Sequence, residues 1–208
     1  MSENCLYIVT PCSRPKNLFC IGSSISRNIK FPVKWIIVLD QKICNDDASK
    51  LFVEYNKERL KKLNIDTSFF VNKDSGLVGH GHRNYALDFL QNRSGWVYFN
   101  DDDNIISEDF KDINFYDRNC SCIVLSQKNS DGNLRFNGGI ALTAEPKNMQ
   151  TYHIDTAQLI YNLSNVRYQR FEQNFYEADG MFAEKFYQKN KNVLFLKDKY
   201  CYYNFLEL

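Results

Sequence analysis

Three consecutive aspartates, Asp101 to Asp103, are the strongest chemical signal in the sequence. They follow Trp96 to Phe99, an apolar run with the length and composition of a buried strand. Adjacent carboxylates repel one another, and a hard divalent cation such as Mn²⁺ or Mg²⁺ relieves that repulsion. In extended backbone Asp101 and Asp103 share one face while Asp102 points away. The triplet therefore predicts that one carboxylate holds a metal while another binds a sugar or ribose hydroxyl; the alternative is a solvated acidic turn.

A second polar cluster, Gly79 to Asn84, stands at the start of an expected helix. Its glycines allow close backbone approach, and a helix N-terminus offers N–H groups to an anion. Arg83 adds a fixed positive fork suited to phosphate. His80 and His82 have a spacing that could bind metal, although no third histidine is near them. A polar helix cap is the alternative interpretation.

Two further strand ends carry polar residues. Thr10, Pro11 and Arg14 belong to the loop after the first apolar run, and Asp40 ends the second run. In open parallel sheets, ligands bind outside the carboxyl ends of the strands. We therefore expect these residues to line a ligand crevice, where Asp40 either accepts a hydrogen bond from a base or ribose or simply caps a turn.

The elements that must position these residues alternate between strands and helices. In the first half we expect strands over 5–10, 33–39, 67–71 and 96–99, and helices over 14–28, 46–63 and 82–91. Such alternation implies parallel strands with right-handed crossovers. In the second half we expect strands over 122–127, 134–137, 140–143 and 193–196, and helices over 152–163 and 179–188. The sequence predicts one α/β domain with a mostly parallel central sheet and helices on both faces.

Composition excludes several classes of function. The chain has 208 residues, 44% hydrophobic, with 26 Lys+Arg against 25 Asp+Glu. That even balance lacks the basic footprint of a nucleic-acid partner, which disfavours a metal-dependent nuclease. No apolar run approaches the roughly 20 residues of a membrane span, and the first residues lack signal-peptide features. The seven cysteines include no C-x-x-C pair, so we expect reduced structural thiols and a cytoplasmic location.

Four segments in order resemble the GT-A glycosyltransferases: Ile8 to Pro15, Trp35 to Asp40, Arg83 to Leu87, and Val97 to Asn104. The pattern is most similar to that of the glucuronosyltransferase family, with its V-T-P-T-Y-x-R-P, W-I-V-V-E-D, R-N-x-A-L and F-A-D-D-D-N segments. The similarity covers residues 5 to 110, about half of the chain. The first loop is one residue shorter than the family's and lacks its tyrosine. The second half has no visible match, so glucuronic acid is not implied as the donor sugar.

The resemblance implies a GT-A (Rossmann-like) fold and a site for a nucleotide-diphosphate sugar, with a UDP-sugar expected. It implies that Pro11 and Asp40 contact the base, with Thr10 and Arg14 in the same loop region as Pro11. It implies that Arg83 binds the diphosphate and that Asp101 and Asp102 bind the ribose and sugar. Asp103, with Asp101, would bind Mn²⁺ or Mg²⁺.

An inverting enzyme also needs a general base, and many inverting GT-A enzymes place a carboxylate at a helix start in the later part of the chain. Asp179, which lies 76 residues beyond Asp103, fits that description, and Glu177 is the second candidate. The alternative for Asp179 is an ordinary helix N-cap. The pair Gly138 and Gly139 marks either a close approach of backbone to a sugar or a hairpin turn.

Together these observations predict a metal-dependent inverting glycosyltransferase that transfers a sugar to a hydroxyl of a glycan or glycoprotein. Residues 1–104 would form the donor half and 105–208 the acceptor half. A nucleotidyltransferase is one alternative, but its first loop is usually rich in glycine and contains lysine, whereas Thr10 to Pro15 has no glycine. A sugar-nucleotide or glycan-binding module without catalysis is the other alternative.

Overall fold

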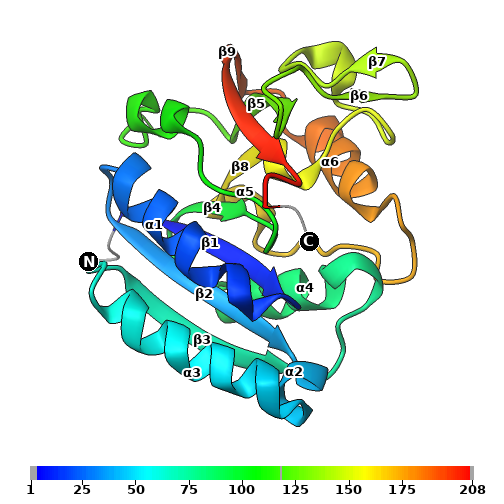
Figure 1. Ribbon diagram of the computed structural model, residues 1–208. Helices are drawn as coiled ribbons and strands as arrows, with labels where there is room; N and C mark the ends of the chain where they lie inside the picture. The colour runs from blue at the N-terminus through cyan, green and yellow to red at the C-terminus, as the bar shows by residue number, and fades with distance from the viewer. Residues whose placement is uncertain (1–3, 118, 207–208) are drawn as a thin grey trace.

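The protein is built on a seven-stranded sheet with β1 (Cys5–Cys12) near its middle (Figure 1). The computed structural model describes residues 4–117 and 119–206. The strand order is β3-β2-β1-β4-β8-β5-β9. The other strands are β2 (Val33–Asp40), β3 (Asp66–Asn72), β4 (Gly95–Phe99), β5 (Cys122–Asn129), β8 (Leu159–Asn162) and β9 (Val193–Tyr203). β8 is antiparallel to both of its neighbours, while the other paired strands of this sheet run parallel. The expected mostly parallel sheet is therefore confirmed.

Helices cover both faces of the sheet, because the side chains of each buried strand alternate between two cores. Leu6 and Ile8 of β1 face one core, with α1 (Leu18–Asn28) and α3 (Asp47–Lys61). Tyr7 and Val9 face the other, with α4 (His80–Phe89) and α6 (Ala178–Lys189). The short helices are α2 (Gln41–Asn45) and α5 (Leu163–Val166), with 3-10 turns at η1 (Pro15–Asn17), η2 (Leu77–Gly79), η3 (Glu108–Asp112), η4 (Pro146–Asn148) and η5 (Thr156–Gln158).

The helix expected over 152–163 is wrong, because this segment supplies β8, an interior strand of the sheet between β4 and β5. Only one 3-10 turn, η5, forms before it, and that turn is closed by a capping box between Asp155 and Gln158. Beyond it, Leu159 and Tyr161 pack in one core and Ile160 in the other. Burial on both faces of a sheet thus decides the structure of an apolar run that periodicity alone leaves ambiguous.

The second half also contains a small separate ribbon. β6 (Phe136–Asn137) and β7 (Ile140–Ala141) pair antiparallel and are shorter than the strands expected there. Gly138 and Gly139 have φ values of 55° and 81° and form the hairpin turn between them. The ribbon follows β5 in the chain and stays close to its end, because the Arg135 N–H donates to the Gln127 carbonyl and the Gln127 N–H donates to the Leu142 carbonyl (Figure 1).

β9 continues to Tyr203, well past the expected end at Leu196. The chain then turns back toward the acidic triplet, and the Leu206 N–H donates to the Asp103 carbonyl at 2.7 Å. The seven cysteines all lie in the described part of the chain and form no disulfide. Within residues 4–117 and 119–206, no helix has both the length and the apolar character to span a membrane.

Candidate active site

A cleft of about 610 Å³ opens where β1, β2 and β4 end. It brings together residues predicted from four separate segments of the sequence: Pro11, Arg14, Asp40, Asp101, Asp102, Asp103, Glu177 and Asp179. The parallel order of β2, β1 and β4 places three of these segments at one edge of the sheet, and α6 supplies the fourth.

The acidic triplet is a turn, not an extended strand end. The Asn104 N–H donates to the Asp101 carbonyl at 3.1 Å, so the chain bends directly after β4. The extended backbone from which we expected Asp101 and Asp103 to share a face opposite Asp102 is therefore wrong. Instead, the guanidinium of Arg14 binds Asp102 and Asp103 together, at 2.5 and 2.8 Å.

Asp102 is buried, and its carboxylate accepts hydrogen bonds from the loop after β1. Its Oδ2 accepts from the Ser13 N–H at 2.6 Å, the Ser13 hydroxyl at 3.0 Å and the Arg14 N–H at 2.7 Å. Its Oδ1 accepts from Arg14 Nε at 2.7 Å. Asp102 thus fixes the loop after β1 to the turn after β4.

Arg14 and Asp103 face the cleft with part of their surface exposed, 27% and 13% of the side chains. Burial raises the pKa of Asp103, and the Arg14 charge opposes that rise. Burial works against the Arg14 charge, but hydrogen bonds and attraction from Asp102 and Asp103 raise the pKa of Arg14 overall. Arg14 is therefore a firmly charged group on the cleft wall.

Arg83 lies beneath the acidic turn, outside the cleft lining. Its side chain is 1% exposed, and its Nη2 donates to Oδ1 of Asp101. Its Nη1 donates to the Val78 carbonyl at 2.8 Å and lies 3.2 Å from Nδ1 of His80. The sequence placed Arg83 at a diphosphate, but the structure uses its charge to support Asp101.

Burial raises the pKa of Asp101 to about 7, although the Arg83 charge pulls it down. The negative charges of Asp179, Asp155 and Asp103 add to the rise. A carboxyl group in a cleft with a strongly shifted pKa is typical of functional sites.

Asp179 lies in the first turn of α6, and Glu177 occupies the N-cap position without a side-chain cap. The alternative reading of Asp179 as an N-cap is therefore wrong. Its Oδ1 is 3.4 Å from Nδ1 of His80, which stacks on Phe171. That oxygen is buried and has no hydrogen-bond partner in the described part of the chain. Burial lowers the pKa of His80, with Asp179 opposing the shift.

Other predicted residues have structural tasks. Thr10 is buried, and its hydroxyl accepts from Trp35 Nε1 at 2.9 Å. Asp40 lines the cleft and also caps α2 by accepting from the Lys42 N–H at 2.9 Å. Gly138 and Gly139 lie outside the cleft lining, and an added Cβ at either would meet nothing within 4 Å.

The segment Gly79 to Asn84 packs against the chain itself. A Cβ on Gly81 would come within 2.2 Å of the Asp74 carbonyl oxygen, and the Gly81 N–H already donates to Ser75. Both histidines are buried but have different neighbours: His82 lines the cleft, whereas Nδ1 of His80 lies close to Arg83 and Asp179. A shared metal site on this pair is therefore not formed.

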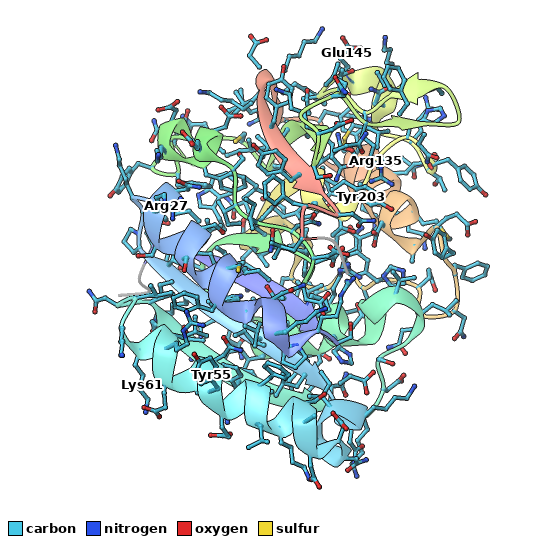
Figure 2. The ribbon with its side chains drawn as sticks, in the orientation of Figure 1. Arg27, Tyr55, Lys61, Arg135, Glu145 and Tyr203 are labelled. Atoms are coloured by element: carbon cyan, nitrogen blue, oxygen red, sulfur yellow. The ribbon has the colours of Figure 1, made fainter. Side chains whose placement is uncertain are left out.

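Several cleft residues were not predicted as site residues: Arg135, Tyr152, Asp155, Tyr176 and Tyr203. Arg135 donates to Asp155 at 2.8 Å and to Gln127 at 2.7 Å. Its guanidinium lies 3.3 Å from the Tyr203 ring centre, and Figure 2 labels both side chains beside the end of β9. Asp155 lies just before β8, in a segment for which a helix was expected, and the others carry no local spacing signal.

The acidic turn offers carboxylate oxygens, the ligands that a hard divalent cation prefers. No group of three His, Cys, Asp or Glu side chains in residues 4–117 and 119–206 forms a protein-only metal site. A cation shared with a nucleotide needs only one or two carboxylates, because phosphate and water supply the other ligands. Asp101 and Asp103 both line the cleft, and Arg83 and Arg14 each hold one of their oxygens. This donor set fits a hard cation held jointly with a phosphate group.

Comparison with known proteins gives structural likeness without sequence similarity. No family model matches the chain, and no curated protein does. TarS 1-349 from S. aureus superposes with a TM-score of 0.68 at 17% identity, over 95% of this chain and 59% of that one. The structure of TarS 1-349 in complex with UDP-GlcNAc superposes with a TM-score of 0.67 at 17% identity, over 97% of this chain and 58% of that one.

Two further solved structures extend the comparison. The mannosyltransferase PcManGT from Pyrobaculum calidifontis, in complex with GDP-Man and Mn²⁺, gives 0.68 at 10% identity over 97% of this chain and 57% of that one. The inositol-1-phosphate CTP transferase from T. maritima gives 0.54 at 11% identity, over 97% and 87%. The chain spans less than two thirds of the length of the TarS and mannosyltransferase structures. These likenesses confirm the α/β GT-A fold expected from the sequence.

Proposed function

We propose that the protein is a metal-dependent inverting glycosyltransferase that takes its sugar from a nucleotide-diphosphate sugar. The observation that carries this proposal is the cleft itself. It gathers the first loop, Asp40, the acidic turn and the start of α6, which the GT-A resemblance assigned separately to one site. The fold shared with solved glycosyltransferases supports the same assignment.

The donor would lie along the edge formed by β2, β1 and β4. Pro11 and Asp40 would contact the base, and Asp102 would hold the first loop in position. Arg14 is a cation that a diphosphate can reach from the cleft, which the buried Arg83 is not. Asp103 and Asp101 would hold Mn²⁺ or Mg²⁺, which when bound supplies charge neutralisation to the departing diphosphate.

The acceptor would enter from the side of α6. Asp179 would take the proton from an acceptor hydroxyl while that oxygen forms its bond to the anomeric carbon. The bond from that carbon to the diphosphate breaks in the same step, so the configuration inverts and a nucleoside diphosphate leaves. Asp179 lines the cleft with 21% of its side chain exposed, which suits this task, and Glu177, in the same lining, is the alternative base.

A UDP-sugar is our first choice of donor and a glycan hydroxyl our choice of acceptor. The experiment is a thermal-shift panel of UDP-GlcNAc, UDP-glucose and GDP-mannose, each with Mn²⁺, Mg²⁺ or EDTA. A donor at 100 times its Kd stabilises the fold by about 2.7 kcal/mol, which corresponds to a rise in Tm of roughly 5–10 °C. We expect such a rise only with metal. Release of nucleoside diphosphate with an inverted product then tests the reaction; no rise with any donor contradicts the proposal.

The second candidate is a nucleotidyltransferase, favoured by the likeness to the T. maritima CTP transferase. Against it, the loop after β1 has no glycine to wrap a triphosphate. CTP and UTP therefore belong in the same panel. Stabilisation by a triphosphate, with release of pyrophosphate when a sugar phosphate is added, would favour this candidate. Donor binding with no turnover on any acceptor would instead indicate a binding module.

A further inference from the structure

Tyr152 has a backbone conformation that an aromatic residue rarely adopts. Its φ is 75°, in the left-handed region. Residues in this region persist where their surroundings impose it, and such residues cluster at functional sites. The residue is 62% exposed, so burial does not explain the conformation.

Three contacts from two elements hold the backbone at this point. Asn137 of β6 donates from Nδ2 to the Tyr152 carbonyl at 2.6 Å. The neighbouring Thr151 donates from its N–H and hydroxyl to Glu184 of α6, at 3.1 and 2.5 Å. Gly180 lets the segment approach α6, because a Cβ there would lie 2.9 Å from the Thr151 Cα and 3.0 Å from the Tyr152 nitrogen.

These contacts fix the place of the ring relative to the candidate base. Gly180 follows Asp179 directly, so Tyr152 is anchored at the helix turn that carries that carboxylate. Tyr152 lines the same cleft as Asp179. Tyr176, which is 73% exposed and three residues before Asp179, lines it too. The backbone is constrained while both rings remain open to a ligand.

The charge of this end of the cleft restricts the ligand. Asp179, Glu177 and Asp155 line it, while the guanidinium of Arg135 is committed to Asp155 and stacked on Tyr203. An anionic ligand would be repelled here. A neutral ring with several hydroxyl donors suits carboxylate acceptors, and its C–H face suits an aromatic ring.

We propose that Tyr152, with Tyr176 beside it, is the platform on which a pyranose ring of the acceptor stacks, which presents its hydroxyl to Asp179. The proposal rests on the proposed function and names the acceptor class as a neutral glycan. Tyr152 would set acceptor affinity and would leave donor binding and proton transfer unchanged.

The test compares Tyr152→Asn, Tyr152→Phe and the control Tyr168→Ala. Asn tolerates the left-handed backbone, so Tyr152→Asn removes the ring without disturbing the fold, and its Tm should equal or exceed that of the wild type. Phe keeps the ring. Tyr168 is 78% exposed and lies outside the cleft lining. The readouts are UDP-GlcNAc affinity with Mn²⁺, hydrolysis of donor without acceptor, and saturation-transfer NMR with a panel of neutral methyl pyranosides.

We expect the wild type with UDP and Mn²⁺ to transfer saturation to ring C–H protons of at least one pyranoside. Tyr152→Asn should weaken that binding, or raise the acceptor KM, roughly tenfold, as loss of a stacking contact implies. Tyr152→Phe and Tyr168→Ala should stay within about threefold, and donor affinity and hydrolysis should not change. A folded Tyr152→Asn variant with wild-type acceptor binding overturns the platform, as does a wild type that engages no pyranoside. Absence of nucleotide-sugar binding in the wild type contradicts the proposed function instead, so the two failures are distinct.

Discussion

Arg83 lies directly beneath Asp101 and donates from Nη2 to its Oδ1, while only 1% of the Arg83 side chain is exposed. This pair joins the start of α4 to the turn after β4, two segments that the sequence marked separately. The charge of Arg83 is therefore paired with Asp101 inside the protein and does not face a ligand. Its expected effect on ligand binding is indirect, through the position of Asp101.

Arg83→Met should destabilise the fold, because it leaves the Asp101 carboxylate without its partner. Loss of one member of a buried ion pair costs about 3–5 kcal/mol, and the 32% exposure of Asp101 points to the lower end. Urea denaturation measures the change. In Arg83→Met with Asp101→Asn, part of the loss should be recovered, since the unpaired charge is gone.

Lys61→Met is the matched control for that measurement. Lys61 pairs with Glu58 at 2.6 Å, but both side chains are about 70% exposed, so its loss should cost less than about 1 kcal/mol. Figure 2 labels Lys61 on α3, away from the cleft. If Arg83→Met unfolds no more easily than Lys61→Met, the buried pair does not support the acidic turn.

Asp103→Asn should abolish the dependence of nucleotide binding on metal. The carboxylate lines the cleft, and an amide oxygen is a much weaker ligand for a hard cation. Calorimetry with UDP should show affinity lost in EDTA, and the same loss in Asp103→Asn with Mn²⁺ present. Asp131→Asn, on an exposed turn outside the cleft lining, removes the same charge and should bind UDP as the wild type does. Equal affinity for UDP under all conditions would exclude the metal role.

The fold was largely predictable because its first half follows simple rules. β1 and β2 are continuous apolar runs, and the helices between the strands have one apolar face. β8 was not predictable in the same way. Leu159 to Asn162 is only four residues long, and its structure depends on pairing with β4 and β5, which are distant in sequence. The local hydrophobic pattern of these four residues does not indicate which strands they pair with.

For the site, the sequence predicted which segments meet but not the contacts that their side chains make. Sequence indicated which segments meet, because the ends of parallel strands share one edge of the sheet. The prediction assumed an extended backbone through the three carboxylates, which the structure replaces by a turn. Asp102 is used by the first loop because the chain bends at Asp101, and only the folded turn reveals that bend. The rings of Tyr152 and Tyr203 reach the cleft from elements that carry no motif.

Glu145 should stabilise the fold in a manner that depends on pH. It accepts from Lys147 at 2.8 Å and from Lys197 of β9 at 2.5 Å, and these bonds lower its pKa to about 2. A carboxyl whose pKa is depressed on folding stabilises the fold above its unfolded pKa and loses that effect as pH falls toward the folded value. The Tm difference between wild type and Glu145→Gln should therefore be full at pH 7 and shrink from about pH 4.5 downward. A difference that is constant from pH 7 to pH 3 would show that this charge is not the cause.

Asp179→Asn should slow transfer without weakening donor binding. A general base contributes about 10²- to 10⁴-fold, so turnover should fall by that order. Asp179 lies in the first turn of α6, where loss of its charge costs about 0.3–1 kcal/mol through the helix dipole, so Tm should fall by only a few degrees. UDP-sugar affinity with Mn²⁺ should stay near the wild-type value. Glu177→Gln, at the N-cap of the same helix and without a side-chain cap to lose, is the parallel variant.

The two variants separate the candidate bases, because both residues line the cleft and differ in their contacts. Asp179 approaches the buried His80, whereas Glu177 makes no side-chain cap at its helix. If Asn at 179 keeps full activity while Gln at 177 abolishes it, Glu177 is the base. If both variants keep full activity, a single displacement has lost its base in this segment, and a product that retains the donor's anomeric configuration would then reject the inverting mechanism. A loss of turnover confined to Asp179→Asn, with an inverted product from the wild type, is the result that the geometry predicts.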